Sequence, residues 1–153
     1  MNPIFQKKIS LDELNDAHRQ SIHTSLGIVF TAIGTNFIEA TMPVDDRSRQ
    51  PAGILHGGAS VVLAESLGSI ASRLVVGTQN AQIFGIEVNA SHLSSVSEGF
   101  VLGRAEPLRI GKTLHVWSIS IKELSTGKPT CHARLTTMVR QGPGITTPHP
   151  LIF

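Results

Sequence analysis

The sequence predicts an α+β domain in which one principal helix packs against a curled antiparallel sheet. The chain has 153 residues, of which 41% are hydrophobic, and this suits one domain with a sizeable core. A long, mostly uncharged helical stretch lies within residues 50–74. Extended runs separated by short turns fill residues 82–140, and this succession of elements is typical of the α+β class.

The N-terminal part predicts two short helical segments and a hairpin. A capping box of the S-x-x-E type at residues 10–13 predicts a helix from residue 11 to about residue 19. A second helical turn is expected near residues 21–25. Extended runs at residues 26–33 and 37–44 are rich in β-branched and aromatic residues, and a short glycine-containing turn joins them, so we expect them to pair.

The principal helix is expected to begin after a turn marked by Pro51 and Gly53. At His56-Gly57-Gly58, the two glycines let the backbone approach another group closely. The free N–H groups and the positive dipole end at a helix start suit an anion, or an oxygen that becomes negative during a reaction. The start of this helix is therefore a candidate oxyanion site.

The two faces of the helix differ in character. At 3.6 residues per turn, one face is apolar: Leu63, Leu67, Ile70 and Leu74. The other is built mainly of small residues around one acid: Gly58, Val61, Val62, Glu65, Gly68, Ser69 and Ser72. A helical Glu ordinarily points to water, but an ordinary solvated face carries several charges. We therefore expect this face to meet another chain or a ligand, where a lone carboxylate needs a partner or a function.

The second half of the chain predicts a meander of antiparallel strands over residues 82–95, 99–107, 113–124 and 129–140. Alternation from His115 to Lys122 indicates a sheet with one covered and one wetter face. A single domain is expected over residues 1–140. Residues 141–153 contain three prolines and show no periodicity, so they are expected to form an irregular tail.

Composition excludes several classes of function. The net charge of +2 is modest and the basic residues are dispersed, which argues against a nucleic-acid partner. The single cysteine, Cys131, and the lack of CxxC or HExxH patterns argue against a disulfide and a metal site. There is no signal-like apolar run and no uncharged apolar run of about 18 residues, so we expect a cytoplasmic protein without a membrane partner.

The distance between the helix start and Glu65 constrains any shared chemistry. Gly57 and Glu65 are eight residues apart, or about 12 Å along a helix axis. A reacting carbon needs its activating donors and its nucleophile within about 3.5 Å. If two copies pack with their helices antiparallel, each helix start can approach the partner's midpoint. This predicts a homodimer with two equivalent sites, each using both chains.

Three segments carry a resemblance to a known family: MPVDDRSRQPAGILHGGASVVLAESLGS (42–69), IEVNASHLSSVSEG (86–99) and EPLRIGKTLHVWSI (106–119). Together with the H-G-G-A-x-x-x-L-A-E core, they resemble the hotdog-fold acyl-CoA thioesterases over roughly residues 26–138. Within that family they look closest to the group that contains 1,4-dihydroxy-2-naphthoyl-CoA thioesterase and the proofreading thioesterase of enterobactin synthesis. The resemblance implies a long helix wrapped by an antiparallel sheet, in dimers that usually pair into tetramers.

The resemblance also implies roles for residues of this chain. Glu65 would be the nucleophile or general base that attacks the thioester. Gln50 and His56 would orient and polarise the carbonyl, and the Gly57 N–H would donate to the oxyanion. Ser69 would help to place water or Glu65. A coenzyme A thioester is the implied substrate, with no metal and no dissociable cofactor.

Substrate-binding candidates lie on the helix and on one strand. Gly58 and Val62 are the candidates on the helix. Asn89 and His92 match the strand that lines the pantetheine channel in the family. Because residues three apart on a strand face opposite sides, only one of them is expected to line the channel, and His92 is preferred.

Each assignment has a structural alternative. Gln50 could close the turn before Pro51, His56 could be a helix-entry residue with a satisfied hydrogen bond, and Ser69 could serve close packing.

Four functions remain to be compared. The first is an acyl-CoA thioesterase for aromatic or medium-chain acyl groups, and the second has the same chemistry on acyl carrier protein. A hotdog-fold hydratase usually shows an Asp and His pair near the helix start, where this chain has His56 alone. A non-catalytic acyl-CoA binder would not need Glu65.

Overall fold

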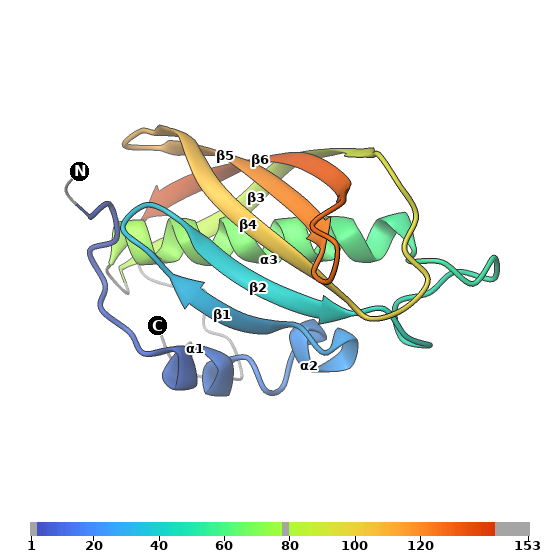
Figure 1. Cartoon of the computed structure of the whole chain (residues 1–153). Coiled ribbons are helices and arrows are strands. Elements are labelled where there is room, and N and C mark those ends of the chain that lie inside the picture. The colour runs from blue at the N-terminus through green and yellow to red at the C-terminus, as the bar shows by residue number, and fades with distance from the viewer. Residues whose placement is uncertain (1–2, 78–79, 143–153) are drawn as a thin grey trace.

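One long helix, α3 (Gly57–Val76), lies across the inner face of a curved six-stranded antiparallel sheet (Figure 1). The computed structural model describes residues 3–77 and 80–142. The elements that precede α3 are α1 (Leu11–Ala17), α2 (Ile22–Leu26), β1 (Val29–Ile33) and β2 (Ile38–Pro43). The elements that follow it are β3 (Ala81–His92), β4 (Phe100–Ile110), β5 (Leu114–Glu123) and β6 (Pro129–Gln141).

The strand order β1-β2-β4-β5-β6-β3 confirms the hairpin of β1 and β2 but corrects the predicted meander. β4, β5 and β6 form a meander, whereas β3 pairs with β6 at the far edge of the sheet. The segment between β3 and β4 crosses the molecule, because β3 lies at one edge of the sheet and β4 lies between β2 and β5, and Val96 within this segment is buried in the core. The Val96 carbonyl accepts a hydrogen bond from the Leu55 N–H at 2.8 Å, which ties this crossover to the turn before α3.

The N-terminal helix α1 covers the β1 edge of the sheet (Figure 1). Its predicted capping box is present, since the Glu13 N–H donates to Ser10 Oγ at 3.2 Å and the Ser10 N–H donates to Glu13 Oε2 at 2.9 Å. The Asn15 side chain then bonds both backbone groups of Phe30, accepting from its N–H at 2.9 Å and donating to its carbonyl at 3.0 Å. The amide side chain of Asn15 thus provides hydrogen-bond partners for the backbone N–H and carbonyl of Phe30 at the sheet edge.

The buried arc of α3 is wider than the sequence predicted. Leu63, Leu67 and Leu74 are fully buried, as expected for the apolar face. Gly68 and Ser72 were expected to face another chain, and this prediction is wrong. A β-carbon at residue 68 would overlap the Leu135 side chain of β6, and Ser72 is fully buried.

The hydroxyl of Ser72 anchors α3 to the sheet. It accepts a hydrogen bond from Trp117 Nε1 at 2.7 Å and lies 2.7 Å from Thr137 Oγ1. All three side chains are fully buried, so each polar atom in this network has a partner away from water. Small residues on α3 therefore serve close helix–sheet approach here.

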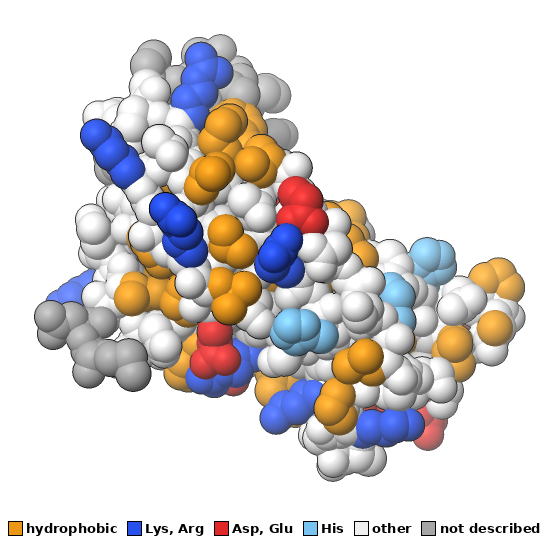
Figure 2. All heavy atoms as spheres, turned by 90° about the horizontal axis from the view of Figure 1, so that it is seen from above, with side chains coloured by type: hydrophobic (Ala, Val, Ile, Leu, Met, Phe, Trp, Pro, Cys, Tyr) orange, Lys and Arg blue, Asp and Glu red, His pale blue; other side chains and the backbone are white. Residues whose placement is uncertain are grey.

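Two further features bear on the sequence predictions. By length and composition α3 could cross a membrane, but most of it is buried against the sheet, as in the core helix of a folded domain. The outer face of the sheet carries apolar side chains among Lys and Arg side chains (Figure 2). Of the predicted tail, residues 143–153 lie outside the described residues, while β6 extends to Gln141.

Candidate active site

The start of α3 presents a backbone donor that the helix itself cannot use. His56 is the N-cap residue, and its Nδ1 accepts the Gly58 N–H at 2.8 Å. The His56 N–H donates to the Ser48 carbonyl at 2.8 Å, which fixes the entry of the chain into the helix. Among the described residues, none accepts a hydrogen bond from the Gly57 N–H. This donor is available to a ligand.

The turn before α3 holds Gln50 beside that donor. The Gln50 N–H donates to the Ile54 carbonyl and the Gln50 carbonyl accepts from the Gly53 N–H, both at 2.9 Å. Gly53 has a φ of 78°, a left-handed conformation that favours glycine. These backbone bonds satisfy the main chain of Gln50 and leave its side-chain amide for other contacts.

A cavity of about 350 Å³ opens at this point. It brings together three residues that the sequence assigned to the site, namely Gln50, Gly57 and His92. The remaining lining residues are neutral: Ile54, Leu55, Ser60, Leu93, Ser94, Ser95 and Thr130. The wall mixes apolar surface with a few hydroxyl and amide groups, which is the usual character of a small-molecule site.

β3 supplies His92 to the cavity but not Asn89. His92 pairs with the buried Cys131 of β6 and shares its inner face of the sheet, whereas Asn89 pairs with the exposed Arg134. The Asn89 side chain donates to Glu87 Oε1 at 2.7 Å on the outer face. Asn89 therefore lies away from the helix start in this chain.

Glu65 lies on a different part of α3 and outside the cavity lining. Its carboxylate is half-buried, and this burial raises the pKa of the carboxyl above its ordinary value of 4.5. The Ser69 hydroxyl, one turn later, donates to Glu65 Oε1 at 3.5 Å. This hydrogen bond lowers the pKa of Glu65 and so opposes the effect of burial. About 12 Å of helix axis separates Glu65 from the Gly57 donor.

A second cavity of about 320 Å³ borders the other side of the helix start. His56, Ala59 and Val62 form its helix wall, and the α2 residues Ile22 and Leu26 face them. Arg47, Ser48 and Arg49 complete the lining.

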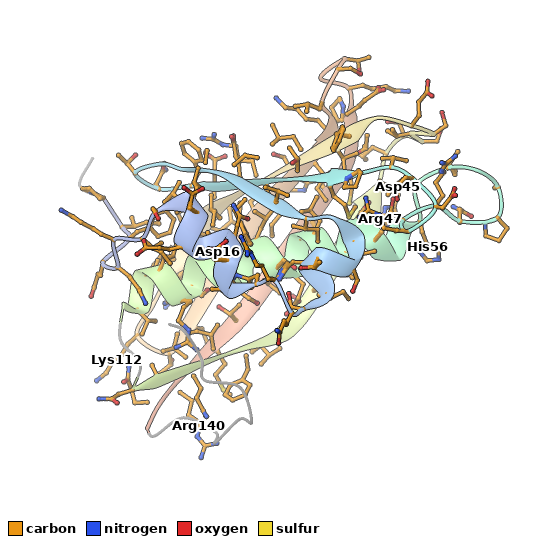
Figure 3. All side chains as sticks on the ribbon, turned by 90° about the horizontal axis from the view of Figure 1, so that it is seen from below. Asp16, Asp45, Arg47, His56, Lys112 and Arg140 are labelled. Carbon is orange, nitrogen blue, oxygen red and sulfur yellow. The ribbon has the colours of Figure 1, made fainter. Side chains whose placement is uncertain are left out.

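The charges around this second cavity are paired. Arg47 donates to both carboxylate oxygens of Asp45, which holds the Asp45 pKa at about 2. Figure 3 shows Asp45, Arg47 and His56 together at this end of α3, with Lys112 and Arg140 towards the other end. Within the described part of the chain, no group of three or more His, Cys, Asp or Glu residues could hold a metal ion.

Comparison with known proteins identifies the family. The family model described as "Thioesterase superfamily" matches residues 52–130, which include α3, β3, β4 and β5. The chain belongs to this thioesterase superfamily. The sequence prediction of a hotdog-fold thioester hydrolase is thereby confirmed at the level of family and fold.

Two relatives of this thioesterase are named for an activity. The chain is 46% identical to 1,4-dihydroxy-2-naphthoyl-CoA hydrolase of Escherichia coli, over 89% of this chain and 98% of that protein. It is 42% identical to the proofreading thioesterase EntH of Cronobacter sakazakii, with the same coverage. A crystal structure of a Haemophilus influenzae thioesterase superposes with a TM-score of 0.87 at 41% identity, covering 90% of this chain and 95% of that one.

One residue near the candidate site of this thioesterase escaped the sequence predictions. Gly85 of β3 lies directly against the Glu65 carboxylate. Its signal in the sequence is a lone glycine inside the run Ile83-Phe84-Gly85-Ile86, a position that indicates a bulge or a close backbone approach.

Proposed function

We propose that this chain hydrolyses acyl-CoA thioesters with aromatic or medium-chain acyl groups to the free acid and coenzyme A. The cavity at the start of α3 carries this proposal, because an unused Gly57 N–H, Gln50 and His92 converge there in a neutral, partly apolar wall. The names of the Escherichia coli and Cronobacter sakazakii relatives support an aryl-CoA or aryl thioester substrate.

In the proposed reaction, the thioester carbonyl oxygen accepts from the Gly57 N–H. Gln50 orients and polarises the carbonyl from the first cavity, and His56 does so from the second cavity on the other side of the helix start. Gly58 and Val62 contribute to substrate binding. In many acyl-transfer enzymes, a preorganised donor at the developing oxyanion accelerates the reaction more than any other single group. The thiolate of coenzyme A then leaves as the carbon–sulfur bond breaks.

Glu65 supplies the attacking group in one of two ways. Its carboxylate can add to the carbonyl to give a mixed anhydride that water then hydrolyses, or it can take a proton from a water molecule that adds instead. Ser69, which already bonds Oε1, holds the carboxylate or that water. Both routes consume one water and release one acid and one thiol.

The active unit is a dimer in this proposal, because Glu65 and the Gly57 donor of one chain are too far apart to act on one carbonyl. The free edge of β3 supports this inference: Ile86 is 52% exposed and Val88 is 37% exposed, and β6 is the only strand paired with β3 in the described part of the chain. Two copies related by a twofold axis can join there and bring each Glu65 to the partner's helix start. Two such dimers pairing into a tetramer would be the larger assembly.

Thiol release tests the proposal. A thiol-reactive dye follows coenzyme A release from aryl, short-chain and long-chain acyl-CoA, for the wild type, Glu65→Ala, Glu65→Asp and the control Glu106→Ala on the outer sheet face. We expect wild-type turnover that falls by about 10³-fold or more in Glu65→Ala and is unchanged in Glu106→Ala. Equal activity of Glu65→Ala and the wild type would remove Glu65 from the mechanism. A wild type that binds the thioesters without turning them over would be a non-catalytic binder.

A second experiment distinguishes coenzyme A from acyl carrier protein as the carrier of the acyl group. The same acyl group is offered on coenzyme A and on acyl carrier protein, and the ratio of kcat/KM values ranks them. Preference for the carrier protein would change the substrate of the proposal but not the chemistry.

A further inference from the structure

We propose that Gly85 of β3 is a positioning residue that forms the seat for the Glu65 carboxylate. The inference rests on the proposed role of Glu65 and extends it to a residue of β3 that does not itself touch the substrate. The seat has two parts, the missing side chain at residue 85 and the β-bulge that follows it.

The Glu65 carboxylate occupies the space that a side chain at residue 85 would need. A β-carbon built on Gly85 would overlap Glu65 Oε1 and would stand 2.8 Å from the carboxylate carbon and 3.1 Å from Oε2. All three nearest atoms belong to Glu65. The carboxylate therefore lies against the backbone of β3, with Oε1 nearest, at the one glycine of that strand.

Backbone conformation does not explain this glycine. Gly85 does not have a positive φ, so its backbone is one that other residues can adopt. A glycine inside a strand costs backbone entropy and contributes no packing, and its neighbours Phe84 and Ile86 are good strand formers. The contacts of residue 85 supply a reason for glycine here, namely the space that the Glu65 carboxylate occupies.

A bulge turns β3 at the same point. Gly85 pairs with Thr137 of β6, whereas Glu87 pairs with Thr136, so Ile86 is the extra residue between them. Bulges bend a strand and redirect its neighbours. The strand thus kinks where the carboxylate lies.

The strand position opposite Gly85 is fixed to α3. Thr137 bonds Ser72 of α3 through their hydroxyls at 2.7 Å, and Ser72 also accepts from Trp117 Nε1. This buried network holds α3 and the sheet in one register. Glu65, two turns earlier on the same helix, consequently meets Gly85 rather than a neighbouring residue of β3.

The seat restricts the carboxylate on one side while Ser69 contacts it on another. A group held in one rotamer approaches a reacting carbon without losing further side-chain freedom. Removing the seat pushes the carboxylate away from β3. The expected effect is on the chemical step rather than on substrate affinity.

Gly85→Ala is the direct test, with Gly103→Ala as its matched control. Gly103 is also a sheet glycine that faces α3, but an added β-carbon there would contact Leu63 and Leu67 instead of Glu65. Both variants add one methyl group at the helix–sheet contact. We expect Gly85→Ala to lower kcat by about 10²-fold with little change in KM, whereas folded Gly103→Ala keeps its kcat.

The same change in a Glu65→Asp background tests whether residue 85 acts through residue 65. Aspartate is one methylene shorter and withdraws from the added methyl group, so Gly85→Ala should cost that background less than about threefold in kcat. This double variant also keeps the test usable if Gly85→Ala alone folds poorly. Equal losses in both backgrounds, or losses shared with Gly103→Ala, would overturn the proposal.

A titration separates this proposal from the proposed function. Carbon-13 NMR of the glutamate carboxyls follows Glu65 without any need for turnover. In Gly85→Ala we expect the Glu65 pKa to fall towards its ordinary value, because the displaced carboxylate gains water. If the Glu65 pKa is unchanged in Gly85→Ala, the proposed positioning role of Gly85 is wrong. Full activity of Glu65→Ala would instead contradict the hydrolytic role of Glu65.

Discussion

The imidazole of His92 lies against the backbone of Gly57, so that a β-carbon on Gly57 would stand 2.7 Å from His92 Nε2. The last residue of β3 therefore closes over the first residue of α3. This contact joins two segments far apart in the sequence at the proposed oxyanion donor.

Gly57→Ala should reduce activity without reducing stability. Alanine leaves the unfolded chain less conformational freedom than glycine does, but its methyl group would displace His92 from the cavity wall. We expect kcat/KM for an aryl-CoA to fall about 10-fold or more, with a melting temperature equal to or above that of the wild type. Repeating the change in His92→Ala should give a smaller loss, and an equal loss would show that the overlap with His92 is not the cause.

Mixing two inactive variants should restore activity if each site uses both chains. Glu65→Ala lacks the attacking group and Gln50→Ala lacks an orienting amide, so a mixed dimer contains one intact site and one doubly altered site. After equal amounts are unfolded together and refolded, about a quarter of wild-type activity is expected. Each variant refolded alone is the control. A mixture no more active than its components would place the complete site within one chain.

Glu65 should make both activity and stability depend on pH. Burial raises its pKa above 4.5, so the acidic limb of kcat/KM should have a midpoint above that value. The folded state binds this proton more tightly than the unfolded state, so the ionised carboxylate opposes folding at neutral pH. Glu65→Gln should therefore be more stable than the wild type at pH 7 in urea unfolding, and this gain should vanish below pH 4.5.

His23 should make the fold sensitive to acid. Burial, and secondarily the neighbouring His18, lower its pKa from 6.5 to about 4. The unfolded state thus takes up the proton first, and the stability present above pH 6.5 is lost as the pH falls towards 4. His23→Phe keeps a ring beside Phe30 and should lose less stability between pH 7 and pH 5. Equal losses of unfolding free energy in the wild type and in His23→Phe over this pH range would contradict the assignment of the acid sensitivity to His23.

Leu67→Ala should cost about 2 to 5 kcal/mol of unfolding free energy, since Leu67 is fully buried between α3 and the sheet. A β-carbon at Gly103 would lie 2.6 Å from Leu67 Cδ1, so alanine at residue 103 fills part of the cavity left by Leu67→Ala. The double variant should therefore be more stable than the sum of the single changes predicts. Strict additivity in urea unfolding would show that the cavity closes in another way.

The sequence predicted the features that depend on local pattern. The capping box at Ser10, the hairpin of β1 and β2, and the start of α3 all follow from residues within a few positions of each other. Boundaries differ by a few residues: α1 ends at Ala17 rather than near residue 19, and β4 continues to Ile110.

Features decided by distant contacts were not predictable in this way. The place of β3 at the far edge depends on its pairing with β6, a strand distant in the sequence, which no local pattern reveals. Small residues such as Gly68 and Ser72 are equally compatible with a helix that packs on a sheet and with one that packs on a second chain. In the structure they face the sheet, where Leu135 lies against Gly68 and Trp117 donates to Ser72.

The candidate site also contains features that the sequence predicted and features that depend on distant contacts. Of the residues that the resemblance assigned to the site, Gln50, Gly57 and His92 line one cavity. The turn that holds Gln50 leads directly into the start of α3, and β3, the strand that follows α3, ends at His92. The contact of Gly85 with Glu65 joins a helix to a strand, so it exists only in the folded chain and leaves no pairing signal in the sequence.

The crossover between β3 and β4 sets the order in which the protein can assemble during synthesis. β3 emerges from the ribosome before β4 and β5, yet its neighbour in this chain is β6, the last of the six strands. Until β6 is made, the strand that carries Gly85 and His92 has no place in the sheet. The nascent chain can pack α3 against β4 before β3 has a partner strand, so the edge of the sheet that carries Gly85 and His92 is completed only after β6 has been made.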